Sequence, residues 1–91
     1  MNDTGPYDVQ YDPRALKELR KLDKPVARRV ARVIDELRSD PRPQRAPLLA
    51  GYPDLWRVRV GDYRAIYTIR DPELVIIVLR IAHRSSVYRD H

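Results

Sequence analysis

The sequence predicts an α+β fold in which a short N-terminal strand and a helical hairpin precede a three-stranded antiparallel meander, with the helices packed on one sheet face. Two observations predict it. Apolar residues recur with a helical period over residues 13–37 and with an alternating period from residue 55 onward. The chain has only 91 residues, so helices and strands have to share a single hydrophobic core.

The first part of the chain predicts a tail, a strand and a first helix. We expect residues 1–6 to be a disordered tail and residues 7–91 to form a single domain. Polar and apolar side chains alternate over residues 7–11, as in a short strand. Asp12 is a typical N-cap residue, and Pro13 suits the first position of a helix. The helix that follows has its apolar positions at Ala15, Leu16, Leu19 and Leu22.

A second helix is expected to start at Pro25, so that the two helices form a hairpin joined at residues 22–25. Its apolar stripe recurs at helical spacing and consists of Val26, Val30, Val33, Ile34 and Leu37. Pro41 and Pro43 cannot continue a helix, so the segment 39–43 ends it.

Three strands are expected in the C-terminal half, over residues 55–60, 63–70 and 74–82. Gly61 and Asp62 join the first two, and a two-residue loop with glycine first suits a type II′ hairpin turn. Residues 71–73 form the next turn. The last strand is nearly continuously apolar, which is expected when both of its faces are covered.

The charge of the chain indicates an acidic partner. The net charge is +5, and of the 18 basic residues all but Lys17, Lys21 and Lys24 are arginine. Arginine presents a planar fork that suits phosphate, and it stacks on bases. Codon usage would also enrich arginine, so the placement of these side chains has to decide between the two explanations.

Several classes of protein are excluded or disfavoured. The chain has no cysteine, which excludes disulfides, zinc–thiolate sites and thiol nucleophiles. The N-terminus has neither the basic start nor the apolar run of a signal peptide. The longest apolar stretch, residues 74–79, is far shorter than the roughly 20 residues of a membrane span. We therefore expect a soluble, cytoplasmic protein with no membrane partner.

The predicted hairpin brings arginines together, because its two-residue loop sets Arg59 opposite Arg64. Side chains alternate across a sheet, so Arg57, Arg59 and Arg64 share one side, which we call the arginine face. The apolar side chains of the hairpin share the other side: Trp56, Val58, Val60, Tyr63, Ala65 and Tyr67. Like charges opposite one another repel by roughly 1 kcal/mol per close pair in water, and a phosphate group would offset this repulsion.

The arginine face also has a purely structural interpretation. The arginines could splay into solvent, or they could pair with Asp54, Asp62 or Glu73. A charged strand face is more often solvated surface than a site.

The end of the last strand adds to the candidate site. His83 and Arg84 should reach the same end of the sheet as Arg64. Histidine titrates near neutral pH, although a surface or partly packed imidazole also fits this position. Tyr88 either stacks on a base or covers the edge of the core.

Common nuclease and cofactor motifs are missing from the sequence. No carboxylate pair has the spacing of a two-metal site, and there is no glycine-rich phosphate loop and no serine-nucleophile motif. We therefore expect no metal and no cofactor. An enzyme of this kind acting on nucleic acid would use cations and the substrate's own 2′-hydroxyl group, which RNA has and DNA lacks.

Three parts of the sequence resemble toxins of the RelE/ParE superfamily. They are Tyr11–Leu22, Leu49–Gly51 with Trp56–Tyr67, and the ending from Ile81 to Tyr88, so that the resemblance spans about residues 7–89. It implies a RelE-like microbial RNase fold and a role in a type II toxin–antitoxin system, on the RelE-like branch.

The resemblance implies roles for individual residues. RelE-like toxins are ribosome-dependent endonucleases that cut messenger RNA without a metal. Their cutting positions correspond here to Arg57, Arg59, Arg64, Arg84 and Tyr88. Arg64 and Arg84 would hold the scissile phosphate, with Arg57 and Arg59 binding the neighbouring RNA.

Arg57 and Arg59 depart from the family pattern, because the best-known RelE-like enzymes have lysine at these positions. Arginine cannot lose its proton near neutral pH, so neither residue can be the general base. A cation can still stabilise the charge that develops on the phosphate oxygens. His83 is the first candidate for the base, and Tyr88 is the second if neighbouring arginines favour its deprotonation.

The resemblance also implies partners. A cognate antitoxin would wrap the toxin and cover the arginine face, and the complex would bind operator DNA through the antitoxin. The substrate would be messenger RNA on the ribosome. The main alternative is a ParE-like inhibitor of DNA gyrase without nuclease activity. An inactive toxin homologue and a basic RNA-binding module are further alternatives.

Overall fold

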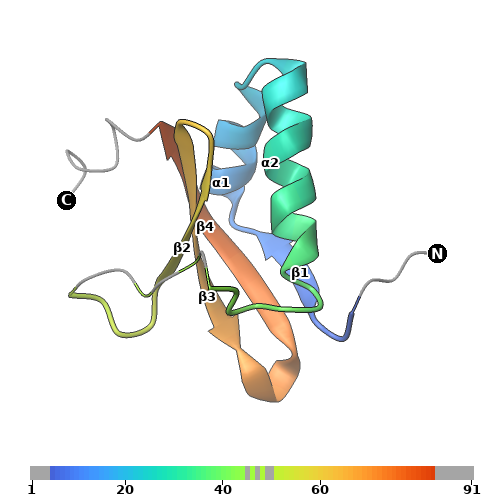
Figure 1. The fold of residues 1–91 in the computed structure, drawn as a ribbon, viewed down its shortest axis with the longest axis vertical. Coiled ribbons are helices and arrows are strands. Elements are labelled where there is room, and N and C mark those ends of the chain that lie inside the picture. Colours follow the sequence, from blue (N-terminus) through green and yellow to red (C-terminus); the bar gives the residue numbers. More distant parts are fainter. Residues whose placement is uncertain (1–4, 45, 47, 49–50, 84–91) are drawn as a thin grey trace.

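The computed structural model describes residues 5–44, 46, 48 and 51–83, which form a four-stranded sheet with two helices on one of its sides (Figure 1). The elements are β1 (Asp8–Tyr11), α1 (Pro13–Arg20), α2 (Lys24–Glu36), β2 (Trp56–Val60), β3 (Tyr63–Arg70) and β4 (Val75–His83), with a 3-10 turn η1 (Asp71–Glu73) before the last strand. The predicted α+β class and the packing of both helices on one sheet face are confirmed.

The strand order is β1-β4-β3-β2. The antiparallel meander of β2, β3 and β4 is confirmed, but β1 pairs with β4 in parallel, from Asp8↔Val75 to Tyr11↔Val78. The sheet is therefore mixed. The alternation of residues 7–11 predicts a strand, but it carries no information about a partner at the far end of the chain.

Both helices begin close to the predicted residues. Asp12 caps α1 by accepting a hydrogen bond from the backbone N–H of Arg14 at 3.0 Å. The second helix begins at Lys24, one residue before the predicted start, and Asp23 precedes it without a side-chain capping bond. After Glu36 the helix tightens, because the next three backbone N–H groups bond to carbonyls three residues back: those of Leu37, Arg38 and Ser39.

The β2–β3 hairpin has the predicted register, with Arg59 opposite Arg64 and Val60 opposite Tyr63. Gly61 has φ 60°, whereas Asp62 is not among the residues with positive φ. A positive φ at the first loop position only is the signature of the predicted type II′ turn. The hairpin was therefore predictable down to its turn type.

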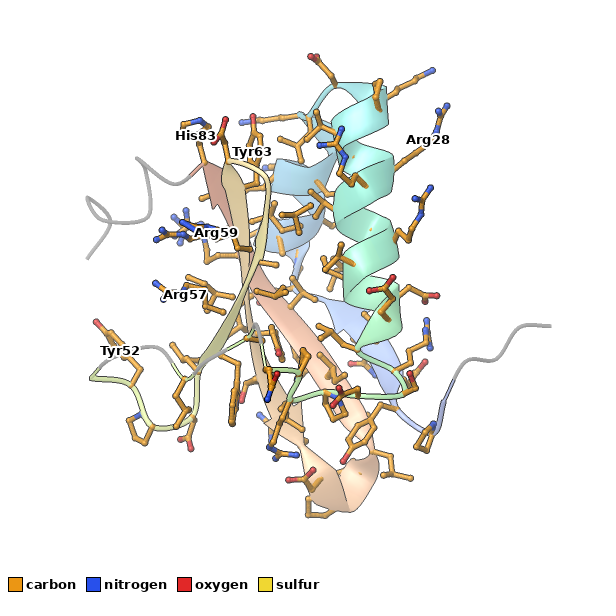
Figure 2. All side chains as sticks on the ribbon, in the orientation of Figure 1. Arg28, Tyr52, Arg57, Arg59, Tyr63 and His83 are labelled. Carbon is orange, nitrogen blue, oxygen red and sulfur yellow. The ribbon has the colours of Figure 1, made fainter. Side chains whose placement is uncertain are left out.

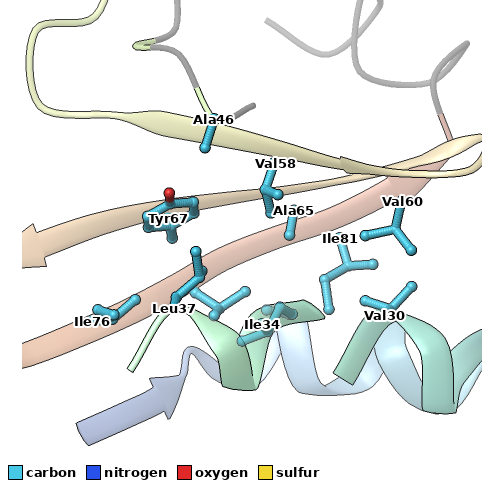
Figure 3. Close-up of a cluster of buried hydrophobic side chains, with 12 residues drawn as sticks. Val30, Ile34, Leu37, Ala46, Val58, Val60, Ala65, Tyr67, Ile76 and Ile81 are labelled. Atoms are coloured by element: carbon cyan, nitrogen blue, oxygen red, sulfur yellow. The ribbon is translucent and has the colours of Figure 1, made fainter. Parts of the chain in front are cut away.

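The core lies between the sheet and the helices, and Figure 3 shows its central side chains. Besides Ala15 of α1, its fully buried members come from the predicted stripe of α2, from the predicted apolar side of the hairpin and from β4: Val30, Ile34, Leu37, Val58, Ala65, Tyr67, Ile76, Val78 and Ile81. Burying each valine, leucine or isoleucine side chain among them contributes about 1.5–3 kcal/mol. The phenol of Tyr67 donates to the carbonyl of Pro41 at 2.8 Å, so that the segment after α2 is tied to the sheet.

The N-terminal tail is only partly within the described residues, because residues 1–4 lie outside them. Gly5 lies against the end of α2, where an added Cβ would come within 2.4 Å of the carbonyl oxygen of Arg38. Among the helices described, none is long and apolar enough to cross a membrane.

Candidate functional site

The arginine face lies on the side of the sheet away from the helices. Arg59 of β2 pairs with Arg64 of β3, which in turn pairs with Ala82 of β4. Two residues away along β2 and β3, Arg57 pairs with Ile66. The side chains of Arg57 and Arg59 project away from α2 (Figure 2). The hairpin therefore gathers the three arginines of the face as its register predicts.

The middle of the arginine face is buried, although both described helices, α1 and α2, lie on the other side of the sheet (Figure 1). Arg64 is 7% exposed, and its apolar neighbours Ile66 and Ala82 are 9% exposed. Arg59 is exposed and Arg57 half-buried. Because arginine stays protonated at any ordinary pH, Arg64 holds a permanent positive charge where solvent screening is reduced. An anion brought to this place is attracted more strongly than it would be in open water.

Arg57 and Arg59 do not pair with the acidic residues that the sequence offered as alternative partners. Within the described part of the chain, neither Arg57 nor Arg59 forms an ion pair. Their predicted alternative partners were Asp54, Asp62 and Glu73. Among the described residues, therefore, no carboxylate competes with an external anion for these two guanidinium groups.

Arg80 lies in the same row of the sheet as Ile66 and Arg57, which was not predicted from the sequence, and its guanidinium group pairs with Glu18 of α1. The β3–β4 ladder pairs Ile66 with Arg80 but Tyr67 with Val78, so Leu79 is an extra residue that forms a β-bulge. Before the bulge Ile76 and Val78 point into the core, and after it Ile81 does. Strict alternation from Val78 would have put Arg80 in the core, and the bulge turns it outward instead. The only signal in the sequence is a charged residue in a run of apolar ones.

His83 reaches the predicted end of the sheet, but on the other side from the arginine face. It pairs with Tyr63, and the two rings make an edge-to-face contact with centroids 5.3 Å apart. Tyr63 packs against the hydrophobic core, so alternation places both rings on the helix side of the sheet. Figure 2 shows them together at one end of the molecule. The structure therefore does not bring His83 to Arg59 and Arg64 in the way that the sequence analysis expected.

Two predicted site residues, Arg84 and Tyr88, lie outside the described residues, and their roles stay predictions. Trp56, predicted to lie on the apolar side of the hairpin, packs against the core and also lies under the guanidinium group of Arg42, 5.5 Å from the ring centroid. In residues 5–44, 46, 48 and 51–83, no three His, Cys, Asp or Glu side chains gather as metal ligands.

Comparison with known proteins gives one family. The model of the family described as the ParE toxin of type II toxin–antitoxin systems matches residues 9–88. The curated relatives include the mRNA interferase toxin RelE of Escherichia coli K12, 33% identical over 88 residues that cover 92% of each chain. Toxin RelE of Mycobacterium tuberculosis is 33% identical over 90 residues, covering 98% of this chain and 93% of the relative.

A solved structure agrees with these relatives. The archaeal RelE–RelB complex from Pyrococcus horikoshii contains a chain that superposes with a TM-score of 0.76 at 33% identity, covering 87% of this chain and 96% of the other. The family model carries the ParE name, but the relatives at about one-third identity are RelE proteins. The chain therefore belongs to the RelE/ParE superfamily of toxins from type II toxin–antitoxin systems, on the RelE-like branch.

Proposed function

We propose that this protein is a toxin that cleaves messenger RNA on the ribosome, using the 2′-hydroxyl group of the RNA and no metal. The observation that carries the proposal is the pairing of exposed Arg59 with buried Arg64 on the sheet face opposite α1 and α2. Two like charges held opposite one another favour an anionic ligand between them. The printed name of the Escherichia coli relative, an mRNA interferase, supports RNA as that ligand.

The chemistry follows from what arginine can do. The 2′-oxygen attacks the adjacent phosphorus, the bond from phosphorus to the 5′-oxygen breaks, and a 2′,3′-cyclic phosphate and a 5′-hydroxyl result. Arg64 and Arg84 would hold the scissile phosphate and stabilise the charge that grows on its oxygens. Arg57 and Arg59 would hold the flanking phosphates. None of these residues has to exchange a proton.

The proton of the 2′-hydroxyl group needs a separate acceptor, and another group must protonate the leaving 5′-oxygen. His83 remains our first candidate for the base and Tyr88 the second. For His83 to act, its ring would have to turn from Tyr63 past the end of the sheet toward the arginine face. We test His83 first, because the structure states which movement its role requires.

We further propose that a cognate antitoxin covers the arginine face and keeps the toxin inactive. The Pyrococcus relative was solved with its RelB partner, which supports a partner of this class. Acidic side chains of the antitoxin would be attracted by the charge that binds RNA. The complex would bind operator DNA through the antitoxin, and the toxin would act in the cytoplasm, where ribosomes and messenger RNA are.

The test is to induce the toxin and map transcripts by primer extension, and to assay gyrase supercoiling with the purified protein. We expect cuts at fixed positions within codons and unaffected gyrase. Arg64→Ala and Arg84→Ala should abolish the cuts. Arg70→Ala is the matched control, since it removes the same charge from an exposed position at the far end of β3.

Intact transcripts together with inhibited gyrase would establish the ParE-like alternative instead. Loss of cutting in Arg70→Ala to the same degree as in Arg64→Ala would show that overall charge, and not the paired arginines, determines activity. Arg64 is buried, so each variant is compared at equal concentrations of folded protein.

A further inference from the structure

One edge of β4 is bonded to β1 in the first half of the strand and to α1 in the second half. Strand β1 pairs with β4 only as far as Val78, and the last bond on this side runs from the backbone N–H of Asp12 to the carbonyl of Val78 at 2.9 Å. Beyond Val78 a side chain of α1 takes over from β1. Glu18 Oε1 accepts the backbone N–H of Ile81 at 2.7 Å.

The same carboxylate also holds the side chain of the preceding residue. Arg80 Nη2 lies 2.9 Å from Glu18 Oε2, and Arg80 Nε lies 3.0 Å from that oxygen. Both side chains are mostly shielded, 22% exposed for Glu18 and 23% for Arg80. Charge-assisted bonds in such a place are stronger than those of an exposed pair. We call this arrangement of Glu18, Arg80 and the Ile81 backbone the Glu18 clamp.

The Glu18 clamp acts where β4 needs support and where the site begins. The bulge at Leu79 interrupts the ladder to β3 immediately before it. The next residue after Ile81 is Ala82, the partner of Arg64, and Arg80 belongs to the row that contains Ile66 and Arg57. The clamp therefore fixes the segment of β4 that lies beside both rows of the arginine face.

We propose that Glu18 is a positioning residue for RNA cleavage: it holds the C-terminal half of β4, through Arg80 and the Ile81 backbone, so that the arginines keep their geometry around the phosphate. This inference rests on the proposed function. Glu18 lies in α1 and bonds to the edge of β4, so it does not itself contact RNA. Misplacing a catalytic group by about 1 Å can cost roughly 10²-fold in rate.

The first test is single-turnover cleavage on programmed ribosomes, with the saturating rate and the half-saturating toxin concentration measured separately. We expect Glu18→Ala to lower the saturating rate by about tenfold or more and to change the half-saturating concentration by less than about threefold. Glu18→Gln should recover most of the rate, because its amide oxygen can still accept the Ile81 N–H. Arg80→Met should fall between the two.

Asp35→Ala is the matched control, because it also removes a helix carboxylate from an arginine pair. Near the C-terminal end of α2, Asp35 Oδ1 accepts a hydrogen bond from Arg38 Nε at 2.6 Å. Any general loss of stability should appear in both variants, but only Glu18→Ala should lose rate per folded molecule. Equal saturating rates for Glu18→Ala and Asp35→Ala would overturn the proposal.

The second test does not depend on cleavage. Amide hydrogen exchange should become faster at Ile81 and Ala82 in Glu18→Ala and stay at the wild-type rate there in Asp35→Ala. Unchanged exchange at these two amides would refute the Glu18 clamp, whatever the toxin cuts. If the exchange difference between Glu18→Ala and the wild type is as expected but the wild type does not cleave, the proposed function is refuted and the clamp remains as a purely structural tie.

Discussion

Arg64 combines burial with a charge that cannot be lost. A lysine or histidine in the same place could shed its proton to escape the cost of burial, whereas a guanidinium group stays charged. Its neighbour Arg59, directly opposite, is exposed and can adjust to a ligand. The pair is thus suited to stabilising an anion, and it is unsuited to moving a proton, which directs attention to His83.

We expect His83→Gln to lower the cleavage rate by about 10²-fold while leaving binding to the ribosome nearly unchanged, since glutamine keeps a polar side chain but cannot act as a base. The measurement is single-turnover cleavage as a function of pH, with ribosome co-sedimentation for binding. Tyr63→Phe keeps the ring beside His83 and serves as the control. Wild-type cutting by His83→Gln would move the role to Tyr88, to be tested by Tyr88→Phe.

At the scale of elements, the β2–β3 turn determines whether Arg59 meets Arg64 at all. Gly61 has φ 60°, and a Cβ at this position would lie at an ordinary contact distance, 3.8 Å, from Arg29 Nη1. Crowding is therefore not what excludes other residues. The left-handed backbone conformation is, because it costs an L-residue about 1–2 kcal/mol.

Gly61→Ala should accordingly lower the free energy of unfolding by about 1–2 kcal/mol. Urea denaturation checks this, with Asp62→Ala as the control in the same loop, where φ is not positive. An unchanged free energy of unfolding in Gly61→Ala would mean that the turn can relax to another type. In that case the register of the arginines would not depend on it.

A second element-scale feature ties together the residue before β1, the loop after α2 and the turn before β4. Asp71 accepts a hydrogen bond from the Tyr7 hydroxyl at 2.6 Å and another from Arg42 Nη2 at 2.7 Å. These bonds, first that from Arg42 and then that from Tyr7, hold the pKa of the Asp71 carboxyl below its usual value. The ionised carboxylate therefore stabilises the folded chain.

The sign of this effect predicts a pH dependence. A carboxyl group whose pKa is lowered by folding contributes its full stabilisation above its unfolded pKa, about 4, and loses it as the pH falls through the folded value. The stability difference between wild type and Asp71→Asn should thus be constant near neutral pH and shrink below about pH 4. Urea melts at several pH values measure it. A difference that grew on acidification would contradict the assignment.

For the whole molecule, the excess of +5 charges is spread over both sides of the fold. The arginine face occupies one side, while α2 carries exposed arginines on the other, among them Arg28, which points away from the sheet (Figure 2). Such a field attracts RNA from any direction and makes its binding sensitive to salt. The arginine face differs in that Arg59 and Arg64 lie directly opposite one another on neighbouring strands, with Arg64 buried.

We expect Arg59→Ala to weaken binding of a non-cleavable single-stranded RNA and to reduce the slope of log affinity against log salt by roughly 0.7, the value for one phosphate contact. Fluorescence anisotropy at several salt concentrations measures both. Arg28→Ala removes the same charge from the opposite side and should leave the slope unchanged. Equal effects of the two variants would mean that RNA is held by the overall field alone.

Much of the fold and half of the candidate site were predictable because they depend on local rules. The helix stripe that contains Val30 and Ile34, the type II′ turn at Gly61 and the facing of Arg59 and Arg64 all follow from spacing along a short stretch of chain. The parallel pairing of β1 with β4 was not predictable, since it joins the two ends of the chain. The side of the sheet on which His83 lies was not predictable either, because the bulge at Leu79 interrupts the alternation of side chains along β4.

By itself, the sequence determined the order of elements, their apolar faces and the register of one hairpin, because periodicity and turn chemistry act between residues that are close in the chain. The tertiary structure alone decided that Leu79 bulges, that Arg80 thereby turns onto the arginine face and that His83 lies on the side of Tyr63. The same packing decided that Glu18 closes the edge of β4. These outcomes arise from competition among strands and a helix for the same hydrogen-bonding groups, which no local pattern records.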